Sequence, residues 1–313
     1  MKSPTICFIL LATIAISFGA SLPAHTAQRA RVFVSVTGND ANPCTAGSPC
    51  KTFQAAHDAV LAGGEISVLD TGGYGTLIIT KALSIVAIGV EASIANTGVG
   101  ITINANPGDK VSLRGLILDG AGQGGTGIAF NSGTSLTVDD CVIRNMAVFG
   151  LAFASNAATP QTLAVSNSSF SDNGNAGVQI ETTSSGAITA SFDRTAFNGN
   201  LTGLAVNGGF GTGPLTVAVT DSVAANNRGS GFGAGSSAGQ SVTNLSLTRS
   251  QALGNVIGIL ANGTATLWLS QSTVTGNTAG FDANGGIIKS YGDNNLQAAN
   301  GPNTGSLTTA MKQ

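Results

Sequence analysis

Side chains able to carry out acid–base chemistry are scarce in this sequence. Of its 313 residues, 15 are Asp or Glu, 13 are Lys or Arg and 2 are His. His25 lies in or beside an apolar N-terminal segment and His57 lies in a predicted helix, so we do not expect a Ser-His-Asp triad. Carboxylates therefore remain the main candidates for catalysis.

The candidate catalytic residues fall into two groups. Glu181 and Asp282 occupy matching strands of a repeated pattern, whereas Asp139, Asp193 and Arg194 occupy the short polar breaks of that pattern. Hydrolysis by a pair of carboxylates requires them to lie ~5–10 Å apart. We assign no catalytic residue from either group.

The charges in the polar breaks alternate in sign from one repeat to the next. We expect Arg194 to face Asp221 and Asp221 to face Arg249, as a solvent-exposed ladder in which each ion pair contributes ~0–1 kcal/mol. The alternative is a concealed site built from four residues, Asp139, Asp140, Asp193 and Arg194. We favour the ladder.

The repeated pattern is clearest in LTVDDCVIRNMAVFGLAF at 136–153, with copies at 163–180, 190–206, 217–232, 245–260 and 267–281. The first polar break of successive repeats falls at Arg114, Asp139, Ser166, Asp193, Thr220, Thr248 and Ser270. A fixed period in the twenties is the signature of a solenoid. Each period holds three short alternating runs and no helix, which predicts an all-β fold. We expect a right-handed parallel β-helix with three strands per coil and about eight to ten coils.

Residue types within a repeat predict how coils stack. Alternate residues such as Leu136 and Val138 should point inward, and Cys141 should be a buried thiol. An asparagine recurs in one turn of each repeat, at Asn145, Asn173, Asn200, Asn227, Asn255 and Asn277. We expect these asparagines to adopt the left-handed conformation and to hydrogen-bond between coils. Glycines after this turn, at Gly150, Gly177, Gly203, Gly258 and Gly280, should permit the corner.

The N-terminal region differs from the repeats. Residues 1–27 have the pattern of a signal peptide, which predicts a secreted or periplasmic protein, and no other stretch is suited to cross a membrane. Residues 28–64 hold a strand, a Cys loop and a helix at 51–60, which should cap the solenoid. In an exported chain, Cys44 and Cys50 suggest a local disulfide, and metal binding is the rival interpretation. The β-helix should span 65–289, with a C-terminal cap or tail at 290–313.

Composition limits the partners. Only 9% of residues are charged and the net charge is −2, so the chain lacks the basic field that nucleic acid or anionic lipid would require. We expect a monomer with no cofactor and no metal.

Two sequence features resemble a known family. The N-terminal pattern FVSVTGNDANPC, PCKTFQAAHDAV and GGEISVLDTGGYG, together with the N-x-x-G-hydrophobic coils, resembles secreted right-handed β-helix proteins of the pectin-lyase-like superfamily. This resemblance covers roughly 31–300. Members include pectate lyases, polygalacturonases, alginate epimerases and lyases, and phage tailspikes. The resemblance implies that a substrate would lie along the outer face of one sheet, formed by the strands after N-x-x-G.

The outward residues of those strands can be read coil by coil. The first row is Thr102, Ala129, Ala152, Gln179, Ala205, Gly233, Leu260 and Asp282, and the second is Asn104, Asn131, Ala154, Glu181, Asn207, Gly235, Asn262 and Asn284. Glu181 and Asp282 are four coils apart, or ~19 Å, too far for an acid–base pair. The expected ligand-binding residues are Gln179, Glu181, Asn207, Asn262, Asp282 and Asn284.

The resemblance does not extend to a complete catalytic motif. Alginate epimerases have Asp-Pro-His after Gly-Phe, but here Gly280-Phe281-Asp282 is followed by Ala283-Asn284. We therefore expect a non-catalytic exported protein that binds polysaccharide or acts structurally, with Trp268 as one possible stacking residue. The alternative is a lyase, epimerase or hydrolase of uronate-containing polymers.

Overall fold

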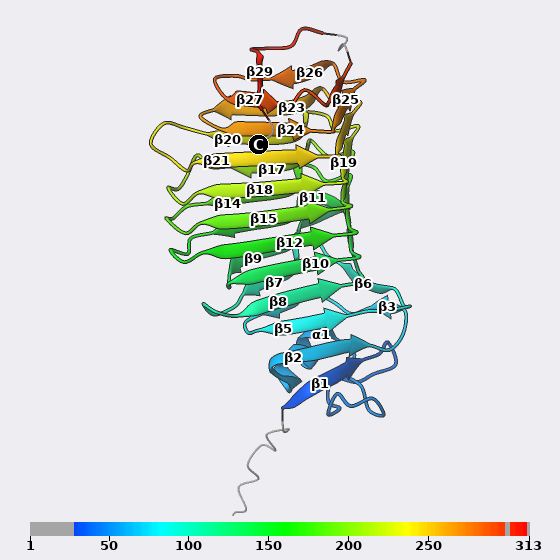
Figure 1. The fold of residues 1–313 in the computed structure, drawn as a ribbon. Helices are drawn as coiled ribbons and strands as arrows, with labels where there is room; N and C mark the ends of the chain where they lie inside the picture. The colour runs from blue at the N-terminus through cyan, green and yellow to red at the C-terminus, as the bar shows by residue number, and fades with distance from the viewer. Residues whose placement is uncertain (1–27, 298–300, 312–313) are drawn as a thin grey trace, which may run out of the picture.

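The computed structural model describes residues 28–297 and 301–311. The predicted signal peptide at 1–27 lies outside the described residues. The described chain winds into a right-handed parallel β-solenoid of about nine turns, as Figure 1 shows. The predicted all-β right-handed parallel β-helix is thus confirmed.

The first strand of each turn belongs to one long parallel sheet, which forms the front of the molecule in Figure 1. Its strands, in spatial order, are β1 (Arg29–Val34), β2 (Val60–Val68), β5 (Leu83–Val86), β8 (Lys110–Arg114), β10 (Ser135–Asp139), β12 (Gln161–Ser166), β15 (Ile188–Asp193), β18 (Leu215–Thr220), β21 (Thr243–Thr248), β24 (Thr266–Ser270), β27 (Ile287–Ser290) and β29 (Leu307–Thr309).

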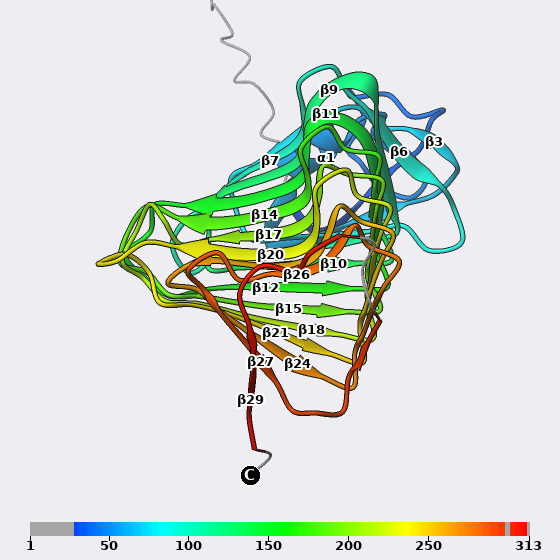
Figure 2. The same ribbon diagram turned by 90° about the horizontal axis from the view of Figure 1, so that it is seen from above.

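The second and third strands of the turns form the other walls, which Figure 2 shows from above. The second strands are β3 (Gly72–Gly73), β6 (Ala92–Ala95), β13 (Ser169–Ser171), β16 (Ala196–Asn198), β19 (Val223–Ala225), β22 (Gln251–Leu253), β25 (Thr273–Thr275) and β28 (Asn295–Leu296). The third strands are β4 (Leu77–Ile79), β7 (Val99–Asn104), β14 (Ala176–Thr182), β17 (Thr202–Asn207), β20 (Ser230–Ser236), β23 (Ile257–Gly263) and β26 (Ala279–Asp282). In two turns a single long strand continues from the second wall into the third: β9 (Leu116–Ser132) and β11 (Val142–Ser155).

The register between turns agrees with the repeat alignment. Asp139 pairs with Arg114 on one side and with Ser166 on the other, and Ser166 pairs with Asp193. Because side chains alternate across a strand, this register places each apolar position above its equivalent in the next turn. Leu136 and Val138, for example, are fully buried.

A ladder of buried asparagine amides runs through the second turn of successive coils, at Asn173, Asn200, Asn227, Asn255 and Asn277. The backbone N–H and the side-chain amide of Asn173 both donate to Oδ1 of Asn200, at 3.0 and 2.9 Å. Each later pair in the ladder repeats this arrangement. The predicted structural ladder is thus confirmed for these five residues.

Two details of the predicted asparagine ladder were wrong. Asn145 is outside the ladder: its amide donates to Asp119, and Met146 stands in the ladder position and donates its N–H to Asn173. Asn145 has the predicted left-handed conformation, with φ 55°, but along the ladder this conformation belongs to the residue before the asparagine, as in Asp172 with φ 56°. An inward-pointing amide needs its own backbone N–H free to donate to the next coil, so the turn is made one residue earlier.

The corner glycines are required by close backbone approach. A Cβ on Gly150 would lie 2.5 Å from the carbonyl oxygen of Gly177, and one on Gly177 would lie 2.7 Å from that of Gly203. Neither glycine has a positive φ. A second inward ladder, of hydroxyls, begins at Cys141, whose N–H donates to Ser168 Oγ at 3.1 Å. Cys141 is buried as predicted.

The N-terminal region covers the first strands. Helix α1 (Phe53–Ala59) is N-capped by Thr52, whose side chain accepts the N–H of Ala55. The helix buries Phe53 and Ala56. It is shorter than predicted, because the chain becomes extended at Val60 and enters β2. Cys44 and Cys50 form the predicted disulfide. The loop that they close lies along β1, where Phe33 N–H donates to Cys44 O at 2.9 Å and Cys50 N–H donates to Phe33 O at 3.0 Å.

Candidate functional site

The outer side of the third strands, called here the third-strand face, carries two rows of outward residues. In the first row, Gln179 pairs with Ala205, followed by Gly233, Leu260 and Asp282 on successive strands. In the second row, Ala154 pairs with Glu181, followed by Asn207, Gly235 and Asn262. The structure thus places Gln179, Glu181, Asn207, Asn262 and Asp282 on one face.

One hollow on this face, called here the Gly233 hollow, has a volume of about 220 Å³ and spans β14, β17, β20 and β23. Gln179, Asn207 and Asn262 line it. It opens because Gly233 and Gly235 present no side chain in a row of larger residues. Neither glycine has a positive φ, and a Cβ would meet atoms no closer than 3.3 Å at Gly233 and 3.8 Å at Gly235. The backbone therefore does not require glycine at either position.

A second hollow, called here the Ala154 hollow, has a volume of about 470 Å³. Asn104, Asn131 and Ala154 line it from the second row, and Asn156 and Thr183 line it from the turns that follow β11 and β14. The amide of Asn131 donates to Asn104 Oδ1 at 2.9 Å. Sequence reasoning missed Asn156 and Thr183, because the turns between repeats vary in length and have no period.

Glu181 lies between these two hollows in the second row. Ala154 and Gly235 are three strand steps apart, with Glu181 and Asn207 between them, which corresponds to about 14 Å at ~4.8 Å per strand. The amide of Gln179 donates to Glu181 Oε2 at 3.2 Å and so orients the carboxylate. The side chains of both residues are partly exposed.

Asp282 and Asn284 lie at the C-terminal end of the face, away from Glu181. Asp282 is four strand steps from Gln179, or ~19 Å, which is too far to act with Glu181 on one bond. Within the described residues its buried Oδ1 has no hydrogen-bond partner. Asn284 donates to Asn262 Oδ1 at 3.1 Å and thereby extends the second row.

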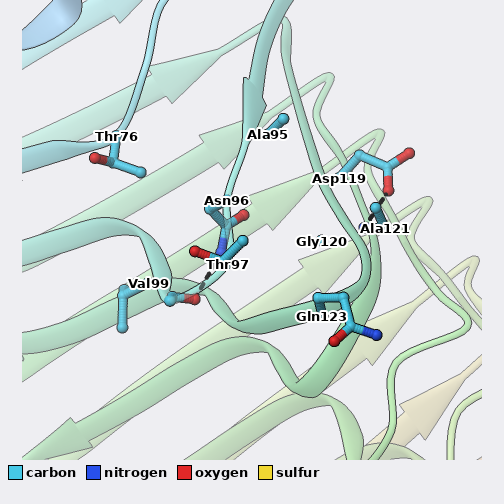
Figure 3. A pocket seen from close by; sticks show the side chains of 10 residues that line it. Thr76, Ala95, Asn96, Thr97, Val99, Asp119, Gly120, Ala121 and Gln123 are labelled. Atoms are coloured by element: carbon cyan, nitrogen blue, oxygen red, sulfur yellow. Dashed lines mark hydrogen bonds between the residues drawn. The ribbon is translucent and has the colours of Figure 1, made fainter.

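A third hollow, of about 540 Å³, lies beside the turn of β9 (Figure 3). Thr76, Asn96, Thr97, Asp119 and Gln123 contribute polar groups to its lining. Burial raises the pKa of Asp119, but hydrogen bonds from Ala121, Asn145 and Arg144 outweigh it, so the pKa lies below its usual value. The sequence signal that could have revealed this hollow is the Gly-rich stretch GAGQGG at 120–125, which lengthens one turn of the solenoid.

The other candidate catalytic residues lie at the turn between the first and second strands and are held in hydrogen bonds. Asp139 accepts from Ser166 Oγ at 2.7 Å and from Asn167 at 2.9 Å, and it pairs with Arg114 at 3.3 Å. These contacts, led by the one from Asn167, hold its pKa below the usual value.

The predicted pairing of the arginines at this edge was half right. Arg249 contacts Asp221 through two 2.8 Å bonds, as expected. Arg194 makes its direct contacts with Asp193 at 2.5 Å and with Asn167 at 2.8 Å, and its charge adds to that of Arg249 in lowering the pKa of Asp221.

A fourth hollow, of about 520 Å³, is lined by Glu91 and Asp140 beside the second strands. Trp268 lies on β24 of the first sheet, where Lys289 Nζ sits 4.2 Å from its ring centre and Tyr291 stacks at 5.9 Å, so it is not part of the third-strand face.

Across 28–297 and 301–311, no three His, Cys, Asp or Glu residues gather as metal ligands. Nor does any helix in those ranges have the length and apolarity to cross a membrane.

Comparison with known proteins agrees with this architecture. The family model "Right handed beta helix region" matches residues 67–197. Pectate lyase Pel9A is similar over 91% of this chain and 78% of that chain, at 16% identity and a TM-score of 0.54. The A-module of the Azotobacter vinelandii mannuronan C-5 epimerase AlgE4 matches over 80% and 91%, at 12% identity and a TM-score of 0.49. A rhamnogalacturonan lyase matches over 90% and 86%, at 12% identity and a TM-score of 0.46.

No curated protein matches the sequence. At these identities the likeness to solved structures concerns the fold alone. The repeat, the three parallel strands of each turn and the family match over 67–197 together show that this chain has a right-handed parallel β-helix fold, similar to that of pectate lyase Pel9A.

Proposed function

We propose that this protein binds a polysaccharide along its third-strand face without chemically altering it. The observation that carries the proposal is the Gly233 hollow. Glycine in the interior of a strand costs about 0.5–1 kcal/mol relative to alanine. Gly233 and Gly235 incur this cost although the backbone does not need them, and the result is an open recess among amide side chains.

The groups around the recess suit sugar hydroxyls. A primary amide offers two donors and an acceptor, so Gln179, Asn207 and Asn262 can each donate to and accept from hydroxyl groups. The Gly233 hollow and the Ala154 hollow follow one another along the solenoid axis, whose extent Figure 1 shows. A series of polar recesses along one straight face fits an extended polymer better than a small compact ligand.

The placement of the charged groups favours binding over catalysis. The two carboxylates of the face, Glu181 and Asp282, are too far apart for one acid–base pair. Asp139, Asp193 and Arg194 are committed to ion pairs and hydrogen bonds at another edge. The protein then shares its fold with a pectate lyase but uses that fold to hold a polysaccharide rather than to cleave it.

The proposal includes export and a closed N-terminal end. The disulfide between Cys44 and Cys50 supports an oxidising compartment, either secreted or periplasmic. The side chains of α1 support its role as a cap: Gln54 accepts the N–H of Ile78 at 2.9 Å and His57 accepts that of Thr80 at 3.2 Å, both at the edge of β4. Without these acceptors the edge would be free to pair with another chain.

Filling the recess tests the binding function. Gly233→Thr and Gly235→Thr should each place a side chain in the hollow with little strain, and should weaken binding in affinity electrophoresis through polysaccharide gels. The matched control is Ala218→Thr, which places the same threonine side chain in the same turn of the solenoid but on β18 of the first sheet. Equal mobility of all variants in every polysaccharide gel would refute binding at this face.

A turnover assay tests the non-catalytic part. Pectin and alginate should remain intact after incubation, with no rise in the absorbance of unsaturated products. Turnover that is lost in Glu181→Gln or Asp282→Asn would replace the binding proposal with an enzymatic one.

A further inference from the structure

We infer that the polymer bound on the third-strand face is uncharged and crosses Glu181 to occupy both the Gly233 hollow and the Ala154 hollow. The inference rests on the proposed function and names its ligand class. It depends on the negative sign of the charges on the face and on the place of Glu181 between the two hollows.

The charged groups of the face are all negative. Glu181 and Asp282 are the ionisable side chains in the two outward rows, which otherwise hold amides, small residues, Thr102 and Leu260. None of the described residues that line the four hollows is Lys, Arg or His. A uronate polymer would therefore bring its carboxylates to a surface that offers them no counter-charge.

Glu181 is the group that such a polymer would meet first. It projects from the middle of the second row, with Ala154 on one neighbouring strand and Asn207 on the other. A carboxylate within about 4 Å of Glu181 at an exposed surface should weaken binding about tenfold, because like charges repel even in a medium close to water. A chain that crosses from one hollow to the other passes directly over this residue.

An uncharged sugar would gain from the same residue. An ionised carboxylate only accepts hydrogen bonds, and its two oxygens can accept from two neighbouring hydroxyl groups. The amide of Gln179 already orients Glu181, so the acceptor needs little ordering when the ligand arrives. Glu181 thus selects against acidic polymers and in favour of neutral ones.

The spacing of the hollows predicts how affinity depends on chain length. Their central small residues, Ala154 and Gly235, are about 14 Å apart at ~4.8 Å per strand. An oligosaccharide that fills only one hollow should bind weakly. Affinity should rise with each added sugar until both hollows are filled, and then level off, since the second contact is intramolecular.

The experiment compares neutral and acidic polymers by isothermal titration calorimetry. The neutral panel holds glucan, mannan, galactan and xylan, and the acidic panel holds polygalacturonate and alginate, each at low and at high salt. At least one neutral polymer should bind about tenfold more tightly than either acidic polymer at low salt. Its affinity should be insensitive to salt, whereas the acidic polymers should gain affinity as salt screens the repulsion.

Glu181→Gln is the decisive variant, with Glu91→Gln as the matched control. Glu91 is an exposed glutamate beside the second strands, so its replacement changes net charge equally but on another wall. Glu181→Gln should raise the affinity for acidic polymers relative to that for neutral polymers about tenfold. Glu91→Gln should leave this ratio of affinities unchanged.

The outcomes separate this inference from the proposed function. An acidic polymer that binds more tightly than every neutral one would overturn the inference and leave binding at the face standing. An unchanged ratio in Glu181→Gln would also overturn it. If no polymer binds, the proposed function itself fails.

Discussion

Asn200 offers a sharp test of what holds the solenoid together. Its side chain is completely buried, and its Oδ1 accepts both the N–H and the amide of Asn173. Its own amide donates to Phe170 O at 3.0 Å and to Asn227 Oδ1 at 3.3 Å. Asn200→Ala would remove all four contacts while leaving the backbone of residue 200 able to bond as before.

The expected loss follows from the groups left without partners. Two buried donors of Asn173 would lose their acceptor, and a buried polar group without a partner costs about 1–3 kcal/mol. We therefore expect Asn200→Ala to lower the free energy of unfolding by about 3–5 kcal/mol. Asn173→Ala should cost less, because the residue before it in the ladder is Met146, which contributes only its N–H.

Equilibrium unfolding in urea, followed by circular dichroism, measures both changes. Asn175→Ala is the matched control, since this exposed asparagine lies two residues after Asn173, one coil before Asn200, and should change stability by less than about 0.5 kcal/mol. A loss below about 1 kcal/mol for Asn200→Ala would refute the reasoning, because the orphaned donors would then have found water or other partners.

Three further predictions follow from other contacts. The pKa of Asp139 is lowered in the folded protein from 3.8, so its contribution to stability is present above that pH and is lost as the pH falls through the folded value. Asp139→Asn should therefore make the free energy of unfolding depend less on pH in that range. An unchanged dependence on pH would contradict this. Reduction of the Cys44–Cys50 disulfide should loosen the loop that lies along β1 and promote self-association by strand pairing at that edge. Light scattering would detect this self-association, and Cys44→Ser should reproduce it without reductant. Burial raises the pKa of Cys141 to about 12, so this thiol should resist alkylation in the native state and react once urea unfolds the chain; rapid labelling of native protein would disprove its burial.

The fold was predictable because its information is local and repeated. Leu136, Val138 and their equivalents recur at a fixed period, and a strand has only two faces, so the inward set determines the register of every turn. The same alternation predicts that Gln179, Glu181 and Asp282 share one outer face, and the strand register confirms it. Figure 2 shows the wall of third strands, with β14, β17 and β20, as separate from the first sheet.

The side-chain partners at the turns were less predictable. Asn145 matched the ladder in spacing but missed it by one residue, because Met146 carries the N–H that reaches Asn173. Arg194 was expected to reach toward the next turn, but it pairs with Asp193. Such choices depend on local backbone angles and rotamers, which a one-dimensional pattern does not contain.

The sequence by itself determined the solenoid, its period and the identity of the outward rows. Only the tertiary structure decided where those rows are hollow and which charges are already paired. The reason is physical: alternation along a strand is a property of the chain, whereas a recess is a property of neighbouring strands. Gly233 and Gly235 are two glycines among 44 in the sequence, and only the side chains on either side of them make them the floor of a hollow.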